Sequence, residues 1–126
     1  MRKNFLKKSQ NKAKNFFVKQ ENLGYNSSIY KSSKFILRST RFTIDYKKIF
    51  KCLDTIDFIY DPINKHWAET DSISISINIY KTFTDELLTN TLIHEALHGV
   101  IIRNSGHTIP EEKEHNIMYL IDPNLI

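Results

Sequence analysis

The stretch of sequence that decides the fold runs from Thr84 to Gly106 and reads TDELLTNTLIHEALHGVIIRNSG. Its apolar residues cover most of the circumference of a helix, a pattern typical of helices that are buried in a protein core. Thr84 is a suitable N-cap, acidic residues occupy the first turn, and Gly106 can end the helix. We therefore predict a long central helix whose body runs to about Arg103.

This helix carries the motif His94-Glu95-Ala96-Leu97-His98. Four residues advance an α-helix by about 400°, so both imidazoles project from one face and can reach the same zinc ion. Glu95 lies beside them, where it can take a proton from the attacking water instead of binding the metal. Buried His and Glu side chains need polar partners, and a metal supplies one. The motif therefore predicts a zinc site with His94 and His98 as ligands and Glu95 as the catalytic base.

A catalytic zinc ion takes a third protein ligand and keeps one position open for water. A second helix is predicted near Pro110, where Thr108 and Glu111 have the spacing of a capping box. The stripe of this helix that faces the core contains, at positions i, i+3, i+4 and i+7, Glu114, Ile117, Met118 and Ile121. Glu114 is therefore the predicted third metal ligand.

Other polar side chains near these two helices leave alternatives open. His115 lies at the edge of the same stripe and is the main alternative third ligand, because histidine binds zinc well. The weaker alternatives are Glu111, Glu112 and His107. A donor that stabilises the transition state is also expected, and its candidates are Arg103, His107, His115 and Tyr119. His66 and Trp67 lie far from the motif in sequence and receive no role.

The middle of the chain predicts one helix and two strands. Asp45 caps a helix of about three turns, and the residues from Ile56 to Tyr60 read as a strand. Residues 61–71 are predicted to form a loop. A second strand follows, because polar residues alternate there with Ile73, Ile75, Ile77 and Ile79.

The first 40 residues are predicted to behave differently from the rest. Apolar residues at loosely helical spacing indicate a short amphipathic helix, followed by a flexible Ser-rich stretch from Asn26 to Ser33. A chain of 126 residues is long enough for one domain with one core. We therefore predict a partly flexible basic arm over residues 1–40 and one α+β domain over residues 41–126, with a small sheet packed on the motif-bearing helix.

Charge is divided unevenly along the chain, whose net charge is +4. Residues 1–51 contain 14 Lys or Arg and two acidic residues, whereas residues 52–126 contain four basic and 12 acidic residues. Such asymmetry is typical of a segment that meets nucleic acid or an anionic surface, or of one that folds against its own acidic half. Nucleic acid is therefore a candidate partner of the basic arm.

Cysteine content and hydropathy indicate the cellular compartment in which the protein is expected. The single Cys52 cannot form an internal disulfide, so we expect a small buried residue in a reducing compartment such as the cytoplasm. No apolar run approaches the roughly 20 residues that cross a bilayer, and the first residues lack the pattern of a signal peptide. We therefore expect neither a membrane span nor a signal peptide.

From about Ile56 onward, the predicted order of elements resembles the minimal zincin metallopeptidases of the gluzincin type. The likeness is to small phage and viral metallopeptidases and to ImmA/IrrE-type proteins, which makes a viral protein in a host cell one expected setting. The segment from Thr91 to His98 resembles their active-site helix, and Glu114-His115-Asn116 resembles the Glu-Ala-Asn segment that supplies their third ligand. The resemblance covers a little over half of the chain.

This resemblance implies hydrolysis of a peptide or protein substrate with zinc as cofactor and Glu114 as third ligand. It also implies that the strand over residues 73–79 lies at the sheet edge beside the cleft, where an extended peptide can pair with it. The metzincin pattern is excluded, because Ile101 and Asn104 stand where it needs Gly and His. The alternative function is a non-proteolytic binding module, stabilised by zinc, whose basic arm binds nucleic acid.

Overall fold

The structure is a computed structural model that describes residues 3–36, 42–71, 74–81, 84–106 and 108–125. Its helices are α1 (Lys3–Leu23), α2 (Ser28–Ile36), α3 (Tyr46–Asp54), α4 (Asp85–Ser105) and α5 (Glu111–Ile121). Two 3₁₀ turns, η1 (Gly24–Asn26) and η2 (Pro123–Leu125), accompany the strands β1 (Asp57–Ile59), β2 (Ala68–Thr70) and β3 (Ile75–Asn78). The predicted α+β class is confirmed.

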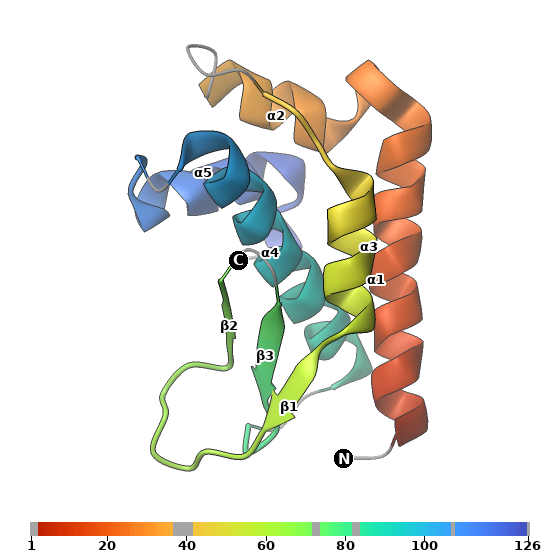
Figure 1. Ribbon diagram of the computed structural model, residues 1–126, viewed down its shortest axis with the longest axis vertical. Coiled ribbons are helices and arrows are strands. Elements are labelled where there is room, and N and C mark those ends of the chain that lie inside the picture. The colour runs from red at the N-terminus through yellow and green to blue at the C-terminus, as the bar shows by residue number, and fades with distance from the viewer. Residues whose placement is uncertain (1–2, 37–41, 72–73, 82–83, 107, 126) are drawn as a thin grey trace.

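Helix α4 is the central element, and α1, α3, α5 and the small sheet surround it (Figure 1). The predicted ends of this helix are confirmed. The main-chain N–H of Leu87 donates to Thr84 Oγ1 at 3.1 Å, and Gly106 closes the helix with a φ of +58°, a conformation that favours glycine. The core around α4 includes side chains that are at most 1% exposed, among them Leu88, Leu92, Leu97 and Ile101.

The sheet corrects one expectation about the predicted strands. Its order is β1-β3-β2, so β3 is the central strand, parallel to β1 and antiparallel to β2. The isoleucine strand therefore does not lie at the edge of the sheet. Ile75 and Ile77 are fully buried, and β3 pairs on both sides, which leaves no free edge for a peptide. Residue 73 lies outside the described residues.

Strand β2 lies within the segment that was predicted to be a loop, and it forms the edge of the sheet next to α4. It has only three residues, Ala68, Glu69 and Thr70, and none of them is a large apolar residue. A pattern of alternating hydrophobicity therefore cannot reveal it. Its existence follows from tertiary pairing with β3, which is the kind of context that overrides local propensity.

The basic N-terminal segment packs against the acidic half of the chain. In α1, Ala13 and Phe17 are fully buried against the core. At the start of α4, the carboxylate of Asp85 accepts a hydrogen bond from Ser9 Oγ at 3.0 Å and forms ion pairs with Lys8 and Lys12. The described part of this segment is therefore a helical layer of the fold, although the predicted boundary at residue 40 lies outside the described residues.

The Ser-rich stretch over residues 26–33 was predicted to be flexible, and it lies in η1 and α2 instead. Ser27 Oγ accepts from the main-chain N–H of Tyr30 at 3.0 Å, as an N-cap does. Ile29 is fully buried and Ser33 is 1% exposed. Serine composition indicated flexibility, but here the serines cap and pack a short helix.

Helix α3 begins at the predicted cap, where Asp45 accepts a hydrogen bond from the main-chain N–H of Lys48 at 3.2 Å. The segment just before it is held to the end of α4 by Asn104. The side-chain oxygen of Asn104 accepts from the N–H of Thr43 at 2.7 Å, and its amide donates to the Thr43 carbonyl at 2.8 Å. Cys52 is buried in α3 as expected, and burial raises the pKa of its thiol to about 11.

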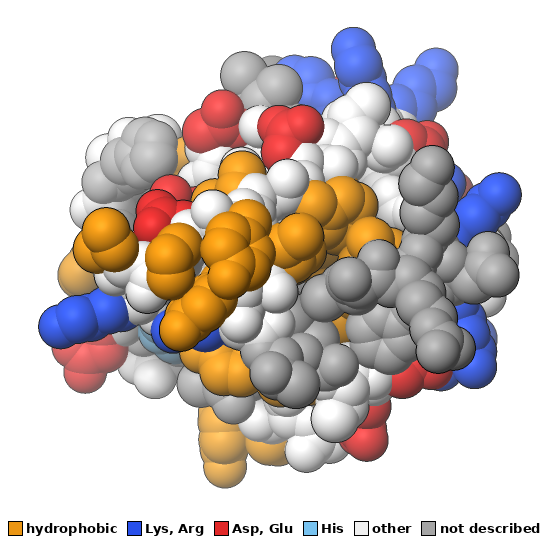
Figure 2. Space-filling view, turned by 90° about the horizontal axis from the view of Figure 1, so that it is seen from below, with side chains coloured by type: hydrophobic (Ala, Val, Ile, Leu, Met, Phe, Trp, Pro, Cys, Tyr) orange, Lys and Arg blue, Asp and Glu red, His pale blue; other side chains and the backbone are white. Residues whose placement is uncertain are grey.

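Hydrophobic side chains also gather on the end of the molecule that Figure 2 views from below. On β1 and in the loop after it, the exposed large hydrophobic residues include Phe58, Ile59, Tyr60 and Ile63. The ring of Tyr60 meets that of Tyr80 edge to face at 5.5 Å. None of the helices formed by the described residues is both long and apolar enough to cross a membrane.

Candidate metal centre

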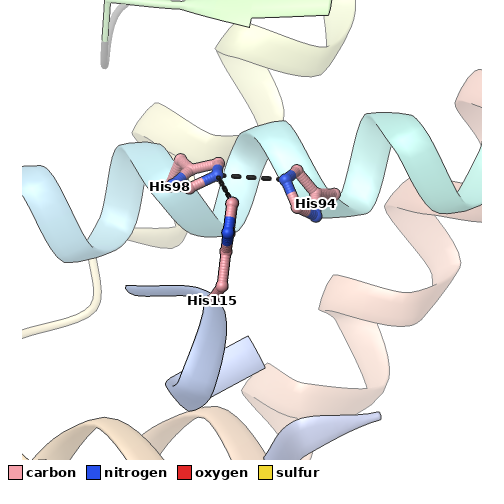
Figure 3. Close-up of side chains that lie close together, drawn as sticks. All are labelled: His94, His98 and His115. Atoms are coloured by element: carbon pink, nitrogen blue, oxygen red, sulfur yellow. Dashed lines mark hydrogen bonds between the residues drawn. The ribbon is translucent and has the colours of Figure 1, made fainter. Parts of the chain in front are cut away.

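Three histidine side chains from two helices meet between α4 and α5 (Figure 3). The Nε2 atom of His98 lies 3.0 Å from Nε2 of His94 and 3.1 Å from Nε2 of His115. His94 and His98 lie one turn apart on α4, as the motif predicts, and His115 reaches them from α5. Among the described residues, these three histidines form the one group whose ligand atoms lie close enough together to hold a metal ion.

Hydrogen bonds fix the protonation of two of these rings. His94 Nδ1 lies 2.5 Å from the carbonyl oxygen of Leu125, and His98 Nδ1 lies 3.1 Å from Oε1 of Glu114. Since a carbonyl and a carboxylate only accept, each Nδ1 carries the proton and donates it. In the neutral rings, both Nε2 atoms therefore present lone pairs to the same point, where a cation relieves their repulsion.

The neutral state of these two rings is favoured by their surroundings. Burial, which disfavours the charged ring, lowers the pKa of His94 to about 4. The hydrogen bond to the Leu125 carbonyl acts in the opposite direction but is the smaller effect. Burial likewise lowers the pKa of His98 to about 4, and the nearby His115 adds to this effect. Neutral imidazoles are the form that binds metals, so no proton competes with a metal at neutral pH.

Glu114, the predicted third ligand, lies behind His98 in the structure. It is buried, as the helical stripe predicted, but its Oε1 accepts from the outer ring nitrogen of His98. Carboxylates in this position orient a ligating histidine and raise its basicity. The structure thus brings together His94, His98 and the alternative residue His115, with Glu114 supporting the group from outside.

His115, and not Glu114, reaches the other two rings because the two side chains leave α5 in different directions. Adjacent residues on a helix point about 100° apart. Glu114 is fully on the buried side, where it meets the edge of His98, whereas His115 is partly exposed and reaches across the opening toward α4. Glu111 also approaches this point, with its Oε1 3.7 Å from His115 Nε2. Glu112, a weaker alternative ligand, is exposed and outside the cleft lining.

A cleft of about 730 Å³ opens beside the three histidines. One wall comes from β2 and the residues just before it, and others come from α4, α5 and η2. Glu95 lines this cleft and is 8% exposed. The pKa of Glu95 is raised to about 7, first by burial and then by the negative charges of Glu111, Glu69 and Glu114. Such a carboxyl group exchanges a proton near neutral pH, as a general base must.

The structure also places residues for which the sequence predicted little. His66 and Trp67 line the cleft, although they lie about 30 residues before the motif. Arg103 and Tyr119, candidates for transition-state stabilisation, do not line it. His107 lies outside the described residues. Beyond the motif itself, the fold thus brings two histidines to the cleft: the candidate His115, and His66, to which the sequence assigned no role.

The loop that carries His66 and Trp67 is tied to β3 by the buried amide of Asn78. Asn78, which is 1% exposed, donates through Nδ2 to the carbonyl of Asp61 at 2.9 Å and accepts through Oδ1 from the N–H of Asp61 at 3.1 Å. Its main-chain N–H donates to the carbonyl of Trp67 at 2.9 Å. The sequence predicted a loop here, but no local signal pointed to its anchor, because Asn78 lies on another strand.

The three histidines fit a transition-metal ion. Nitrogen ligands about 2.0–2.1 Å from one tetrahedral zinc ion lie about 3.3 Å apart, close to the observed separations of 3.0 and 3.1 Å. Imidazole suits zinc, copper, iron or nickel, whereas calcium and magnesium prefer oxygen. The orientation of His94 and His98 by a carbonyl and a carboxylate is also typical of metal ligands.

Comparison with known proteins adds no relative to this picture. The chain matches no protein-family model, no curated protein and no solved structure. The resemblance to zincins therefore stays a prediction from the motif, and the site is interpreted from its own geometry.

The third ligand can be identified by zinc affinity. We expect His115→Ala to lose far more affinity than Glu114→Gln, because the first change removes a ligand and the second leaves an oxygen that still accepts from His98. Removal of the group that orients a ligating histidine lowers metal affinity by about 10- to 100-fold. Chelator competition with purified protein measures both, with Glu112→Gln as the control on the same helix. A larger loss in Glu114→Gln would make Glu114 the ligand.

The raised pKa of Glu95 predicts a pH-dependent stability difference. Between about pH 4.5 and pH 7, folded metal-free protein keeps the proton on Glu95 and the unfolded chain has lost it. Raising the pH through this window therefore lowers the free energy of unfolding, by up to about 3 kcal/mol in total. Glu95→Gln removes this cost. We expect the free energy of unfolding of Glu95→Gln, relative to wild type, to increase with pH in urea titrations; a constant difference would contradict the raised pKa.

Proposed function

We propose that the protein is a zinc-dependent metallopeptidase. The observation that carries this proposal is the convergence of three imidazole Nε2 atoms beside a buried glutamate in an open cleft. Three protein ligands leave a position for water, which separates catalytic zinc sites from structural ones with four protein ligands. A buried glutamate with no metal-binding role is the further group that hydrolysis needs.

Each residue has a distinct part in this proposal. His94, His98 and His115 hold the zinc ion, and Leu125 and Glu114 orient two of those rings. When bound, zinc supplies Lewis acidity that polarises a carbonyl and lowers the pKa of water toward about 7. Glu95, which lines the cleft beside the histidines, takes the proton of the attacking water and gives it to the leaving amine.

Strand β2 supports a peptide as the substrate. Trp67 is paired with Asn78 of β3 through its carbonyl, so the next residue, Ala68, directs its main-chain groups away from β3. This open edge lines the cleft. An extended peptide can therefore add to β2 by main-chain hydrogen bonds while its scissile bond faces Glu95. The edge that the resemblance assigned to residues 73–79 is thus assigned to β2 in this proposal.

Replacement of Glu95 tests the peptidase proposal. Glu95→Gln removes the base but no metal ligand, so we expect zinc affinity within a few-fold of wild type and a cleavage rate lower by about 10²–10⁴. Cleavage of a mixed, quenched peptide library by zinc-loaded protein, followed by mass spectrometry, provides the readout. Equal cleavage by both proteins would assign the activity to another source, and no cleavage by wild type would count against a peptidase.

A second candidate is a zinc-stabilised module that binds nucleic acid. Figure 1 shows α1 and α3 side by side, on the side of the molecule away from α5 and β2. The exposed lysines of these two helices that form no ion pair within the described part of the chain are Lys7, Lys19, Lys47, Lys48 and Lys51. Such a surface favours phosphate contacts without base recognition.

Salt dependence tests this second candidate. We expect the triple variant Lys47→Gln, Lys48→Gln, Lys51→Gln to bind a DNA duplex more weakly, with a slope of log affinity against log salt that is shallower by about 2 to 3. Fluorescence anisotropy between about 50 and 200 mM salt measures both. The variant Lys65→Gln, Lys113→Gln is the control outside α1 and α3. Binding of wild type that ignores salt, or no binding, would remove this candidate.

A further inference from the structure

The cleft beside the histidines is strongly acidic. Four glutamates line it: Glu95, whose raised pKa keeps it partly protonated, and Glu114 are buried, and Glu69 and Glu111 are exposed at its rim. No lysine or arginine is found among the described residues that line it. Carboxylates of one sign in a cleft focus the electric field and raise the local concentration of cations. A divalent ion on the histidines balances part of this charge; Glu111 lies near that ion, whereas Glu69 belongs to the opposite wall, on β2.

Glu69 is the rim carboxylate with the most defined position. It lies on the edge strand β2, and its Oε1 accepts a hydrogen bond from Asn64 Nδ2 at 3.3 Å. Asn64 belongs to the loop that Asn78 holds in place. A carboxylate held by its neighbours loses little rotamer freedom when it binds a cation, so more of the Coulomb attraction appears as affinity. The other rim carboxylate, Glu111, lies 3.7 Å from His115 Nε2, so a metal ion on the histidines would neutralise part of its charge.

The tryptophan of the cleft supplies an independent reason to expect a cation. Trp67 stands two residues before Glu69, directly before β2, and both residues line the cleft. Trp67 is 42% exposed and lines the cleft. An indole face attracts lysine and arginine side chains through its quadrupole, more strongly than any other aromatic ring. An aromatic face beside a fixed carboxylate suits a side chain with an apolar stem and a cationic end.

We propose that the rim formed by Trp67, Glu69 and Glu111 is a subsite for a cationic side chain, lysine or arginine, of a peptide that occupies the cleft. This inference rests on the proposed peptidase function only in taking a peptide as the occupant. The subsite makes the protein selective for basic segments of extended polypeptide. Peptides with acidic residues at the same position meet two rim carboxylates and are disfavoured by like-charge repulsion.

Binding can be measured without any cleavage, because Trp67 is the chain's only tryptophan and lies in the cleft. The probes are three extended hexapeptides without tryptophan, identical except for one central residue, which is lysine, glutamine or glutamate. Titrations are followed by Trp67 fluorescence in chelator-treated and zinc-loaded protein that comprises residues 1–126. We expect the lysine peptide to bind about tenfold more tightly than the glutamate peptide at low salt, with a smaller ratio at high salt.

Three variants identify the residue that is responsible. Glu69→Gln is expected to lower the lysine-to-glutamate ratio about fivefold, and Glu69→Lys to reverse it. Glu112→Gln makes the same charge change on an exposed residue outside the cleft, so it is expected to keep the wild-type ratio. Circular dichroism confirms that each variant is folded before it is titrated.

The outcomes separate this subsite from the peptidase itself. Equal affinity for the three peptides, or a lysine preference that Glu69→Gln and Glu112→Gln reduce alike, overturns the subsite. Cleavage by zinc-loaded wild type without any preference for lysine also overturns it, although the peptidase then stands. A lysine preference in binding that depends on Glu69 supports the subsite, even where the bound peptide is not cleaved and the peptidase fails.

Discussion

The structure depends on one constraint: helix α4 is buried along most of its length, so each polar side chain it carries must find a partner within the protein. The partners come from different parts of the chain. Asn104 binds the main chain of Thr43, and His98 binds Glu114 on α5. Glu95 faces the cleft. The buried polar side chains of α4 need partners, and these partners come from α5 and from the segment before α3. The same contacts assemble the candidate site.

The histidines show how closely the site and the fold are connected. The two acceptors that orient His94 and His98 lie 31 and 16 residues further along the chain. One is a main-chain carbonyl in the turn η2, and its position depends on how α5 ends. A metal centre of this kind has little tolerance for movement between α4 and α5, because both ligands and their supporting groups are divided between these elements.

Much of this arrangement could be predicted from local sequence. The caps at Thr84 and Asp45 and the glycine at the end of α4 are chemical signals, and all three are found where expected. The spacing of His94 and His98 fixes their common face through helix geometry alone. What local patterns could not supply is distance between elements: the stripe on α5 predicted that Glu114 is buried, but not that the neighbouring His115 reaches the other two rings. A loop was predicted before β2, but strand β2 and the anchoring of that loop by Asn78 depend on β3, so no local signal marks them.

The contact between α1 and the start of α4 has a consequence for the order of events during synthesis. Ser9 and its partner Asp85 are 76 residues apart in the chain. A ribosome therefore completes the strongly basic first helix long before Asp85, the carboxylate that pairs with Lys8 and Lys12, exists. Until α4 emerges, the buried face of α1, with Ala13 and Phe17, also lacks the surface that covers it. The nascent chain is thus a cationic, amphipathic segment without its intramolecular counterpart, close to ribosomal RNA, and tertiary folding waits for this late contact between distant parts of the chain.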